Sequence, residues 1–177
     1  MEIELKQWCS QYKIELIKLC NEVNRNYISN RLPLPYSEED ADWWLDKVSK
    51  DEGDKGIFRA ILLGGKLIGN ISIEKKHDVF EKDAEIGYML FAEDSANGYM
   101  TNAVSQICDI AFKELDLKRI TGLVYEPNKA SMRVLEKNDF VLEGIMKDAV
   151  CKNGNIYDLC IYGKYLEINK IISNTRK

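Results

Sequence analysis

The stretch best suited to ligand chemistry is a loop of turn-forming and small residues at 93–98, between an apolar run and a helical pattern. A strand that leads through such a loop into a helix presents unpaired backbone N–H groups and the positive end of the helix dipole, which together bind phosphate. Gly98 permits close approach of the backbone to a ligand, and Ser95, Ala96 and Asn97 add little bulk. Taken alone, the pattern is explained more simply by an ordinary connector, and the phosphate interpretation depends on the rest of the chain.

Two regular elements must hold this loop in place. Residues 84–91 are apolar and alternate, which predicts a strand with a buried face. From Met100 to Leu115 the apolar residues recur at intervals of three and four, which predicts an amphipathic helix. Residues 119–125 read as a strand parallel to the first, because the chain returns through a helix and such crossovers are right-handed. The sequence therefore predicts a central βαβ unit.

The flanking pattern predicts further helices and antiparallel hairpins. Strands are expected at 3–8, 57–63, 67–74, 140–151 and 156–165, and helices at 10–24, 38–50 and 127–138. Ser37, with Asp40 at the third helical position, predicts an acidic capping box. Gly64-Gly65 and Asn153-Gly154 favour tight hairpin turns because these residues accept positive φ.

The expected fold class is α/β (α+β): a mixed, mostly antiparallel sheet of about seven strands with a central βαβ unit and helices on both faces. No repeat or linker divides the chain. A single domain is therefore expected over residues 1–166, followed by a polar C-terminal tail at 167–177.

Composition narrows the class of protein. The net charge of −4 gives no reason to expect nonspecific nucleic-acid binding. The five cysteines are scattered, odd in number and without metal-ligand spacing, which is typical of reduced core residues and predicts a cytoplasmic protein. His77 is the only histidine, so no metal site is expected. The absence of a long apolar run predicts neither a signal peptide nor a membrane span.

Four motifs together are characteristic of one family. They are AEIGYMLFAEDSANGYMTNAV from Ala84, NKASMRVLEKNDF from Asn128, LPLPYSEEDA from Leu32 and GNIYD from Gly154. In this order they resemble the GNAT superfamily of acetyl-CoA-dependent N-acetyltransferases, and within it the RimJ/RimL-type group. The resemblance covers about residues 3–164. It implies a GNAT-like fold and direct transfer of acetyl from acetyl-CoA to a primary amine, without a metal.

For acetyl-CoA, the resemblance implies that the central strand splays from its parallel neighbour and frees backbone groups for the pantetheine and the acetyl oxygen. A bulge in that strand would fit this. The cofactor-binding residues expected on this basis are Met89, Leu90, Phe91, Ser95, Ala96, Asn97, Gly98, Tyr99, Met100, Asn128, Ser131 and Lys137. Asn128 equally fits a helix cap, and Lys137 a solvated helix end.

The chain departs from the family pattern at several positions. Of the family loop Q/R-x-x-G-x-G/A only Gly98 is retained, while Ser95 occupies the Gln/Arg position. Ala96 stands where RimJ/RimL-type members often have glycine, and Asp139 replaces the usual glycine before Phe140. The added β-carbons are expected to lower CoA affinity or shift the loop. A CoA-binding module with lost or weak catalysis is therefore the alternative function.

Direct transfer requires a base for the amine and a donor for the departing thiolate. Glu85 is the candidate base, because it is the one carboxylate within the apolar run and partial burial would raise its pKa. An exposed strand residue or a salt-bridge partner is the open alternative. Many family members protonate the thiolate with a tyrosine where this chain has Leu135. Ser131 is the nearest substitute by pattern, although it equally fits a polar residue in a first helical turn.

The acceptor amine is expected in an aromatic-lined pocket formed by Tyr36, Trp43, Tyr88 and Tyr157. Helical spacing places at least one of the adjacent residues Trp43 and Trp44 in the core. A protein N-terminus and a small amine are both compatible with the sequence. The choice between them is expected to depend on the loops 26–36 and 75–82. No nucleic acid or membrane partner is expected, and the chain is expected to be a monomer or a homodimer.

Overall fold

The computed structural model describes residues 2–166, so the predicted polar tail at 167–177 lies outside the described part of the chain. Its strands are β1 (Ile3–Gln7), β2 (Gly56–Leu63), β3 (Lys66–Lys75), β4 (Asp83–Leu90), β5 (Arg119–Tyr125), β6 (Val141–Lys152) and β7 (Asn155–Tyr165). Its α-helices are α1 (Lys13–Glu22), α2 (Glu38–Asp51), α3 (Tyr99–Glu114) and α4 (Lys129–Glu136). Short 3-10 turns are η1 (Ser10–Tyr12), η2 (Arg25–Tyr27), η3 (Asp78–Phe80) and η4 (Ala92–Asp94). Each predicted element is present with ends within a few residues of the prediction.

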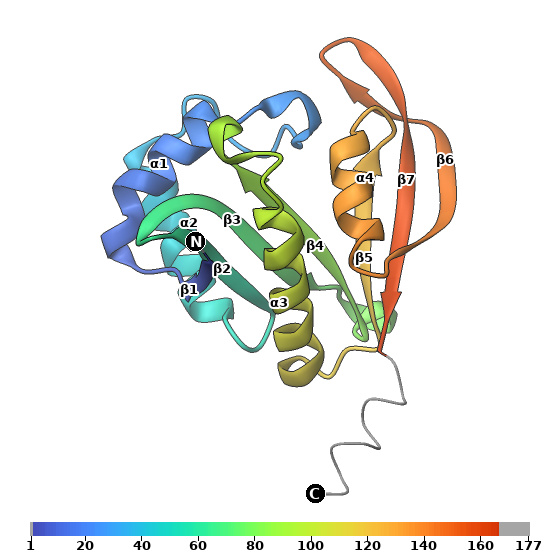
Figure 1. The fold of residues 1–177 in the computed structure, drawn as a ribbon, viewed down its shortest axis with the longest axis horizontal. Helices are drawn as coiled ribbons and strands as arrows, with labels where there is room; N and C mark the ends of the chain where they lie inside the picture. The colour runs from blue at the N-terminus through green and yellow to red at the C-terminus, as the bar shows by residue number, and fades with distance from the viewer. Residues whose placement is uncertain (1, 167–177) are drawn as a thin grey trace, which may run out of the picture.

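Within residues 2–166, the strands form one seven-stranded sheet in the order β1-β2-β3-β4-β5-β7-β6 (Figure 1). Neighbouring strands are antiparallel except β4 and β5, which are parallel and joined through α3. The predicted mixed sheet with a central βαβ unit is confirmed.

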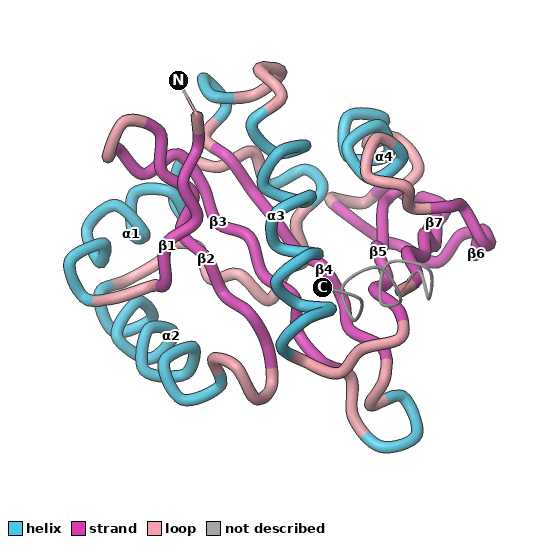
Figure 2. The backbone as a smooth tube through the Cα atoms, turned by 60° about the horizontal axis from the view of Figure 1, so that its bottom comes forward, coloured by secondary structure: helices cyan, strands magenta, loops and turns pink. Residues whose placement is uncertain are grey.

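Helices cover both faces of the sheet (Figure 2). The buried stripe of α3 packs with Ile57 and Ile61 of β2, whereas α1 and α2 pack with Phe58 and Leu62 of the same strand. Because successive side chains of a strand point to opposite faces, β2 is apolar at nearly every position and serves two cores.

Local turn chemistry is as predicted. The Ser37 hydroxyl accepts a hydrogen bond from Asp40 N–H at 3.2 Å, and the Asp40 carboxylate accepts one from Ser37 N–H at 2.8 Å, which completes the capping box of α2. The hairpin between β2 and β3 turns at Gly64 and Gly65, with φ of 58° and 82°. Both angles lie in the left-handed region that favours glycine.

The feature that shapes the site is the early end of the pairing between β4 and β5. Their ladder begins at Asp83 and Arg119 and ends at Ile86 and Gly122, although both strands continue. The strands then diverge (Figure 1). We call the opening between residues 87–90 and 123–125 the wedge. The predicted splay is confirmed, but the bulge expected in β4 is wrong, because β4 pairs with β3 without a register shift.

Candidate active site

Two residues of β4 present their backbone to the wedge. Phe91 N–H donates to the carbonyl of Ile68 in β3 at 3.0 Å. Alternate residues of a strand turn their backbone groups to opposite edges, so Tyr88 and Leu90 direct theirs away from β3, toward the wedge. Of the three residues here that were predicted to bind CoA, Leu90 directs its backbone to the wedge, whereas Met89 and Phe91 direct theirs to β3. Tyr88, which is not among the predicted CoA-binding residues, also directs its backbone to the wedge.

The predicted phosphate loop follows the end of β4 and leads into α3. Gly98 is the N-cap of α3, with φ of 79°, and no side chain caps the helix. A Cβ built on Gly98 would meet nothing within 4 Å, so the space above the cap is open. The Asn97 amide donates to the Ser95 carbonyl at 3.1 Å and closes the turn. An uncapped helix N-terminus beneath open space is the geometry that favours an anion.

The C-terminal end of α4 lies beside this helix start. The Asn138 amide donates to the carbonyl of Thr101, in the first turn of α3, at 3.1 Å, and to Val134 in α4 at 2.9 Å. Lys137 therefore stands exposed close to the phosphate loop. This position is compatible with its predicted contact to a CoA phosphate.

The N-terminal end of α4 carries the predicted thiol donor. Asn128 caps the helix by accepting a hydrogen bond from Ser131 N–H at 3.2 Å, as predicted. The Ser131 Oγ lies 2.7 Å from the Tyr88 Oη, across the wedge. Burial raises the pKa of Tyr88 to about 12, so its phenol stays protonated at neutral pH. Leu135, where many family members have tyrosine, is fully buried against Gly122.

Tyr88, predicted for the acceptor pocket, lies on the opposite face of the sheet from Glu85. Tyr88 packs against the core that contains Ile86 and α3, and its hydroxyl bonds α4. Glu85 is an odd number of positions away on the same strand and therefore faces the other side of the sheet, where α1 and α2 lie. The two residues cannot line the same pocket.

Glu85 is half-buried, and among residues 2–166 it forms no ion pair or side-chain hydrogen bond. Burial raises the pKa of its carboxyl above the ordinary value, with Lys76 and Arg31 opposing and Glu74 adding to the rise. The predicted rise in pKa is confirmed, and the salt-bridge alternative finds no partner within the described chain. A half-buried carboxyl without such a partner, in the paired part of β4 just before the wedge begins, can accept a proton.

A polar cluster beside Glu85 was not predicted. Thr121 Oγ1 lies 2.9 Å from each carboxylate oxygen of Asp83, and Lys76 Nζ is 2.6 Å from Asp83 Oδ2. Arg119 joins the cluster through Thr121 at 3.1 Å. These bonds tie β4 to β5 over their paired part and so fix the point at which the strands separate. The sequence offers one local indication of this cluster, which is that charged residues, Asp83 and Arg119, begin β4 and β5.

One hydrogen bond joins two segments that lie far apart in the sequence. Lys152, at the end of β6, donates to Asn30 Oδ1 in the loop before α2 at 2.7 Å. Tyr157 is three residues from Cys160, which faces the α3 core, so Tyr157 faces the same side as Glu85. That side is compatible with its predicted role.

The other two predicted aromatic residues lie on α2 or just before it. Tyr36 is buried, its hydroxyl donates to the Asp40 carbonyl at 3.3 Å, and its backbone bonds Asn21, which gives it a structural role. Trp43 is 66% exposed, whereas Trp44 packs edge-on against Trp8, with 5.1 Å between the ring centroids. The expectation of one core tryptophan is met by Trp44.

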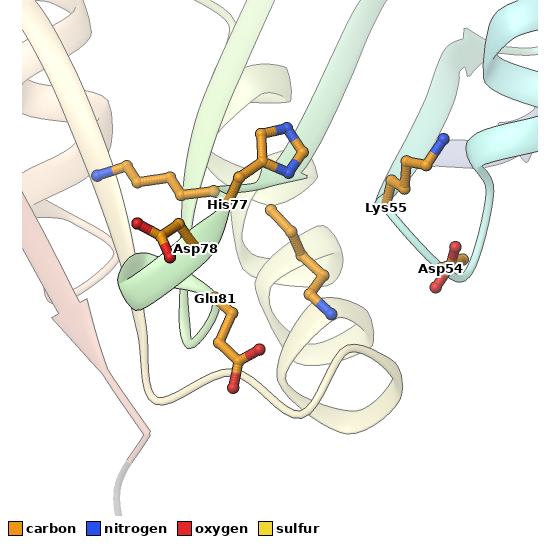
Figure 3. A pocket seen from close by; sticks show the side chains of 7 residues that line it. Asp54, Lys55, His77, Asp78 and Glu81 are labelled. Atoms are coloured by element: carbon orange, nitrogen blue, oxygen red, sulfur yellow. The ribbon is translucent and has the colours of Figure 1, made fainter.

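A separate surface pocket of about 240 Å³ lies where the chain enters β4, at the opposite end of the strand from the phosphate loop (Figure 3). It is lined by charged residues of both signs and by the one histidine: Asp54, Lys55, Lys75, Lys76, His77, Asp78 and Glu81. Within the described part of the chain, no group of three or more His, Cys, Asp or Glu side chains is arranged to hold a metal ion. No helix among residues 2–166 is long and apolar enough to span a membrane.

Comparison with protein families matches residues 3–141 to the acetyltransferase (GNAT) domain. The chain belongs to the GNAT acetyltransferase family. One relative, the putative ribosomal N-acetyltransferase YdaF of Bacillus subtilis (strain 168), is 36% identical over 107 residues, which are 60% of this chain and 58% of YdaF. The chain spans 54–61% of the length of three B. subtilis relatives that it matches, YoaA, YjcK and YdaF.

Solved structures share the fold of this GNAT chain. The microcin C7 self-immunity acetyltransferase MccE, solved in complex with acetyl-CoA and AMP, superposes with a TM-score of 0.77 at 26% identity over 93% of each chain. RimL, a ribosomal L7/L12 alpha-N-protein acetyltransferase in complex with coenzyme A, gives a TM-score of 0.80 at 20% identity over 94% of this chain and 95% of RimL. The likeness to RimL concerns the fold alone.

The GNAT chain adopts left-handed backbone at two positions where the resemblance led us to expect glycine. Ala96 has φ of 64° and Asp139 has φ of 63°, both in the left-handed region. A residue with a β-carbon is strained there, by roughly 1–2 kcal/mol for most residue types. The β-carbon of Ala96 therefore adds strain to the phosphate loop, whereas Asp139, of a residue type better tolerated in this region, lies after α4.

Proposed function

We propose that the chain transfers the acetyl group of acetyl-CoA to a primary amine. The observation that carries this proposal is the end of β4–β5 pairing at Ile86 and Gly122, with the uncapped N-terminus of α3 beyond it. The wedge offers an extended ligand the free backbone of Tyr88 and Leu90, and the start of α3 offers its phosphates a positive dipole. These features fit the shape and charge of acetyl-CoA.

Two side chains take opposite roles in the reaction. Glu85 accepts the proton of the attacking amine, directly or through a water, since an α-amine has a pKa near ~8 and a lysine near ~10.4. Ser131 donates a hydrogen bond to the sulfur as the carbon–sulfur bond breaks. Backbone N–H groups of the wedge are placed to stabilise the negative charge that develops on the acetyl oxygen.

The acceptor is a protein N-terminus or a small amine. YdaF is named as a putative ribosomal N-acetyltransferase, which supports the first. The hydrogen bond between Lys152 and Asn30 holds the loop 26–36, which we expect to select the acceptor, to the end of β6. We also propose a cytoplasmic reaction, which the five free thiols support.

A thiol-release assay tests the proposal directly. The protein is incubated with acetyl-CoA and one of four amines: an N-terminal peptide, an N-blocked lysine peptide, a polyamine and an aminoglycoside. Thiol release that depends on one amine supports acetyl transfer and identifies the acceptor class. Binding of CoA by calorimetry without release for any amine would favour a CoA-binding module, and absence of binding would contradict both.

A further inference from the structure

Tyr88 connects the two sides of the wedge. Its hydroxyl lies 2.7 Å from Ser131 Oγ and 3.3 Å from the Ser131 carbonyl, 43 residues away in the sequence. Ser131 is also fixed through its backbone, because Asn128 accepts its N–H. The serine hydroxyl, the one candidate thiol donor in α4, is therefore held by a residue of β4.

We propose that Tyr88 is a positioning residue for thiolate departure, holding Ser131 so that the serine O–H points to the sulfur. This rests on the proposed function. Either hydroxyl can donate in this contact; because a phenol is a stronger acid than an aliphatic hydroxyl, we assign Tyr88 as the donor to Ser131 Oγ, the nearer of the two Ser131 oxygens. A serine in a first helical turn otherwise bonds nearby backbone groups. When Ser131 Oγ accepts the hydrogen bond from Tyr88, the hydrogen of the serine hydroxyl is free to bond another acceptor. Hydrogen bonds that are linked in a buried chain also strengthen one another.

The arrangement also replaces a missing residue. Leu135 occupies the position where many family members carry a tyrosine acid, and its side chain fills the space over Gly122, where a Cβ would lie 2.6 Å from Leu135 Cδ1. Leucine supplies no hydroxyl at this position. The phenol of Tyr88 comes instead from the neighbouring strand and acts through Ser131.

The proton balance does not require Tyr88 to ionise. When the carbon–sulfur bond breaks, the electron pair stays on sulfur, and the hydrogen bond from Ser131 stabilises the thiolate. The amine proton leaves through Glu85 to solvent, and the sulfur takes a proton from solvent as the thiol departs. Both hydroxyls therefore keep their protons. Full transfer from Tyr88 would be uphill, because burial raises its pKa to about 12, above the ~8.5 of an ordinary thiol.

Tyr88→Phe removes the hydroxyl alone, and Tyr162→Phe is its matched control. Tyr162 is a buried tyrosine whose Oη bonds Glu136, at the other end of α4, at 3.0 Å. The readout is the pKa of the CoA thiol bound to the protein, followed by the ultraviolet absorbance of the thiolate. We expect this pKa to rise by about one unit in Tyr88→Phe and to stay unchanged in Tyr162→Phe, with kcat about tenfold lower in Tyr88→Phe at an unchanged KM for acetyl-CoA.

Ser131→Ala and the double variant Tyr88→Phe/Ser131→Ala complete a double-mutant cycle with Tyr88→Phe. If Tyr88 acts through Ser131, Tyr88→Phe has no further effect once Ser131 is alanine, whereas Ser131→Thr keeps the parent thiol pKa. An unchanged thiol pKa in Tyr88→Phe, additive effects in the double variant, or loss of the fold in Tyr88→Phe with Tyr162→Phe intact would each overturn the proposal. Failure of the parent protein to bind CoA would instead contradict the proposed function.

Discussion

Glu85 and Tyr88 lie three residues apart on β4 and present their side chains to opposite faces of the sheet. The carboxylate of Glu85 faces the side of α1 and α2, and the hydroxyl of Tyr88 reaches Ser131 of α4 at 2.7 Å. Because alternate side chains of a strand point in opposite directions, one strand would supply both halves of the proposed transfer reaction. In that proposal, the base lies on the side of the incoming amine, and the support for the leaving thiolate lies on the other.

Glu85→Gln is expected to lower kcat by on the order of 10²-fold, because the amide keeps the shape of the side chain but cannot accept the proton. The loss should shrink as the pH rises and the amine loses its proton unaided. Steady-state kinetics from neutral to alkaline pH measure both effects. Glu114→Gln, which alters an exposed carboxylate at the far end of α3 from the phosphate loop, is the matched control. A kcat of Glu85→Gln within about threefold of the parent at neutral pH would return Glu85 to a structural role.

The same substitution should stabilise the fold at neutral pH. Burial raises the pKa of Glu85 in the folded chain above the value of 4.5 that it has when unfolded. A carboxyl with a raised pKa contributes stability that is present below 4.5 and is lost as the pH rises through the folded value. Glu85→Gln should therefore melt at a higher temperature than the parent at pH 7, with a smaller gain in acid. Parallel melting curves across the whole pH range would contradict this linkage.

Ala96→Gly should relieve the strained turn of the phosphate loop. Ala96 has φ of 64°, where glycine carries no steric penalty, so we expect the free energy of unfolding to rise by about 0.5–1 kcal/mol. CoA affinity should be equal or higher. Ala92→Gly, in the neighbouring turn η4, is the control. Ala92 is not among the residues with positive φ, and its replacement should lower stability. Urea unfolding of both variants measures the difference, and a less stable Ala96→Gly would argue against strain at this position.

Local patterns predicted most of the fold because the interactions that set its elements are local. The capping box at Ser37 and Asp40 and the hairpin glycines Gly64 and Gly65 each depend on a few consecutive residues. The parallel pairing of β4 and β5 followed from the helix between them. The family resemblance added the splay of these strands, which hydropathy alone does not encode.

The side-chain arrangement of the site could not be predicted in the same way. The bond between Tyr88 and Ser131 joins residues 43 positions apart, and that between Lys152 and Asn30 joins residues 122 positions apart. Alternation along β4 separates Glu85 from Tyr88, but no local pattern says which helices cover each face. The sequence therefore predicts Tyr88 in the acceptor pocket, and it does not predict the polar cluster around Thr121.

The central claim is that the wedge and the start of α3 bind CoA, and Gly98→Glu tests it most directly. The substitution places bulk and negative charge in the open space at the helix N-terminus. Gly53→Glu is the matched control, because Gly53 also has φ of 79° and open space around its Cβ position, but lies in the turn between α2 and β2.

Isothermal titration calorimetry with CoA gives the deciding measurement, with circular dichroism to confirm that both variants fold. We expect Gly98→Glu to weaken CoA binding by well over tenfold, more than ~1.4 kcal/mol, and Gly53→Glu to bind as the parent does. Unchanged CoA affinity in a folded Gly98→Glu protein would contradict the account.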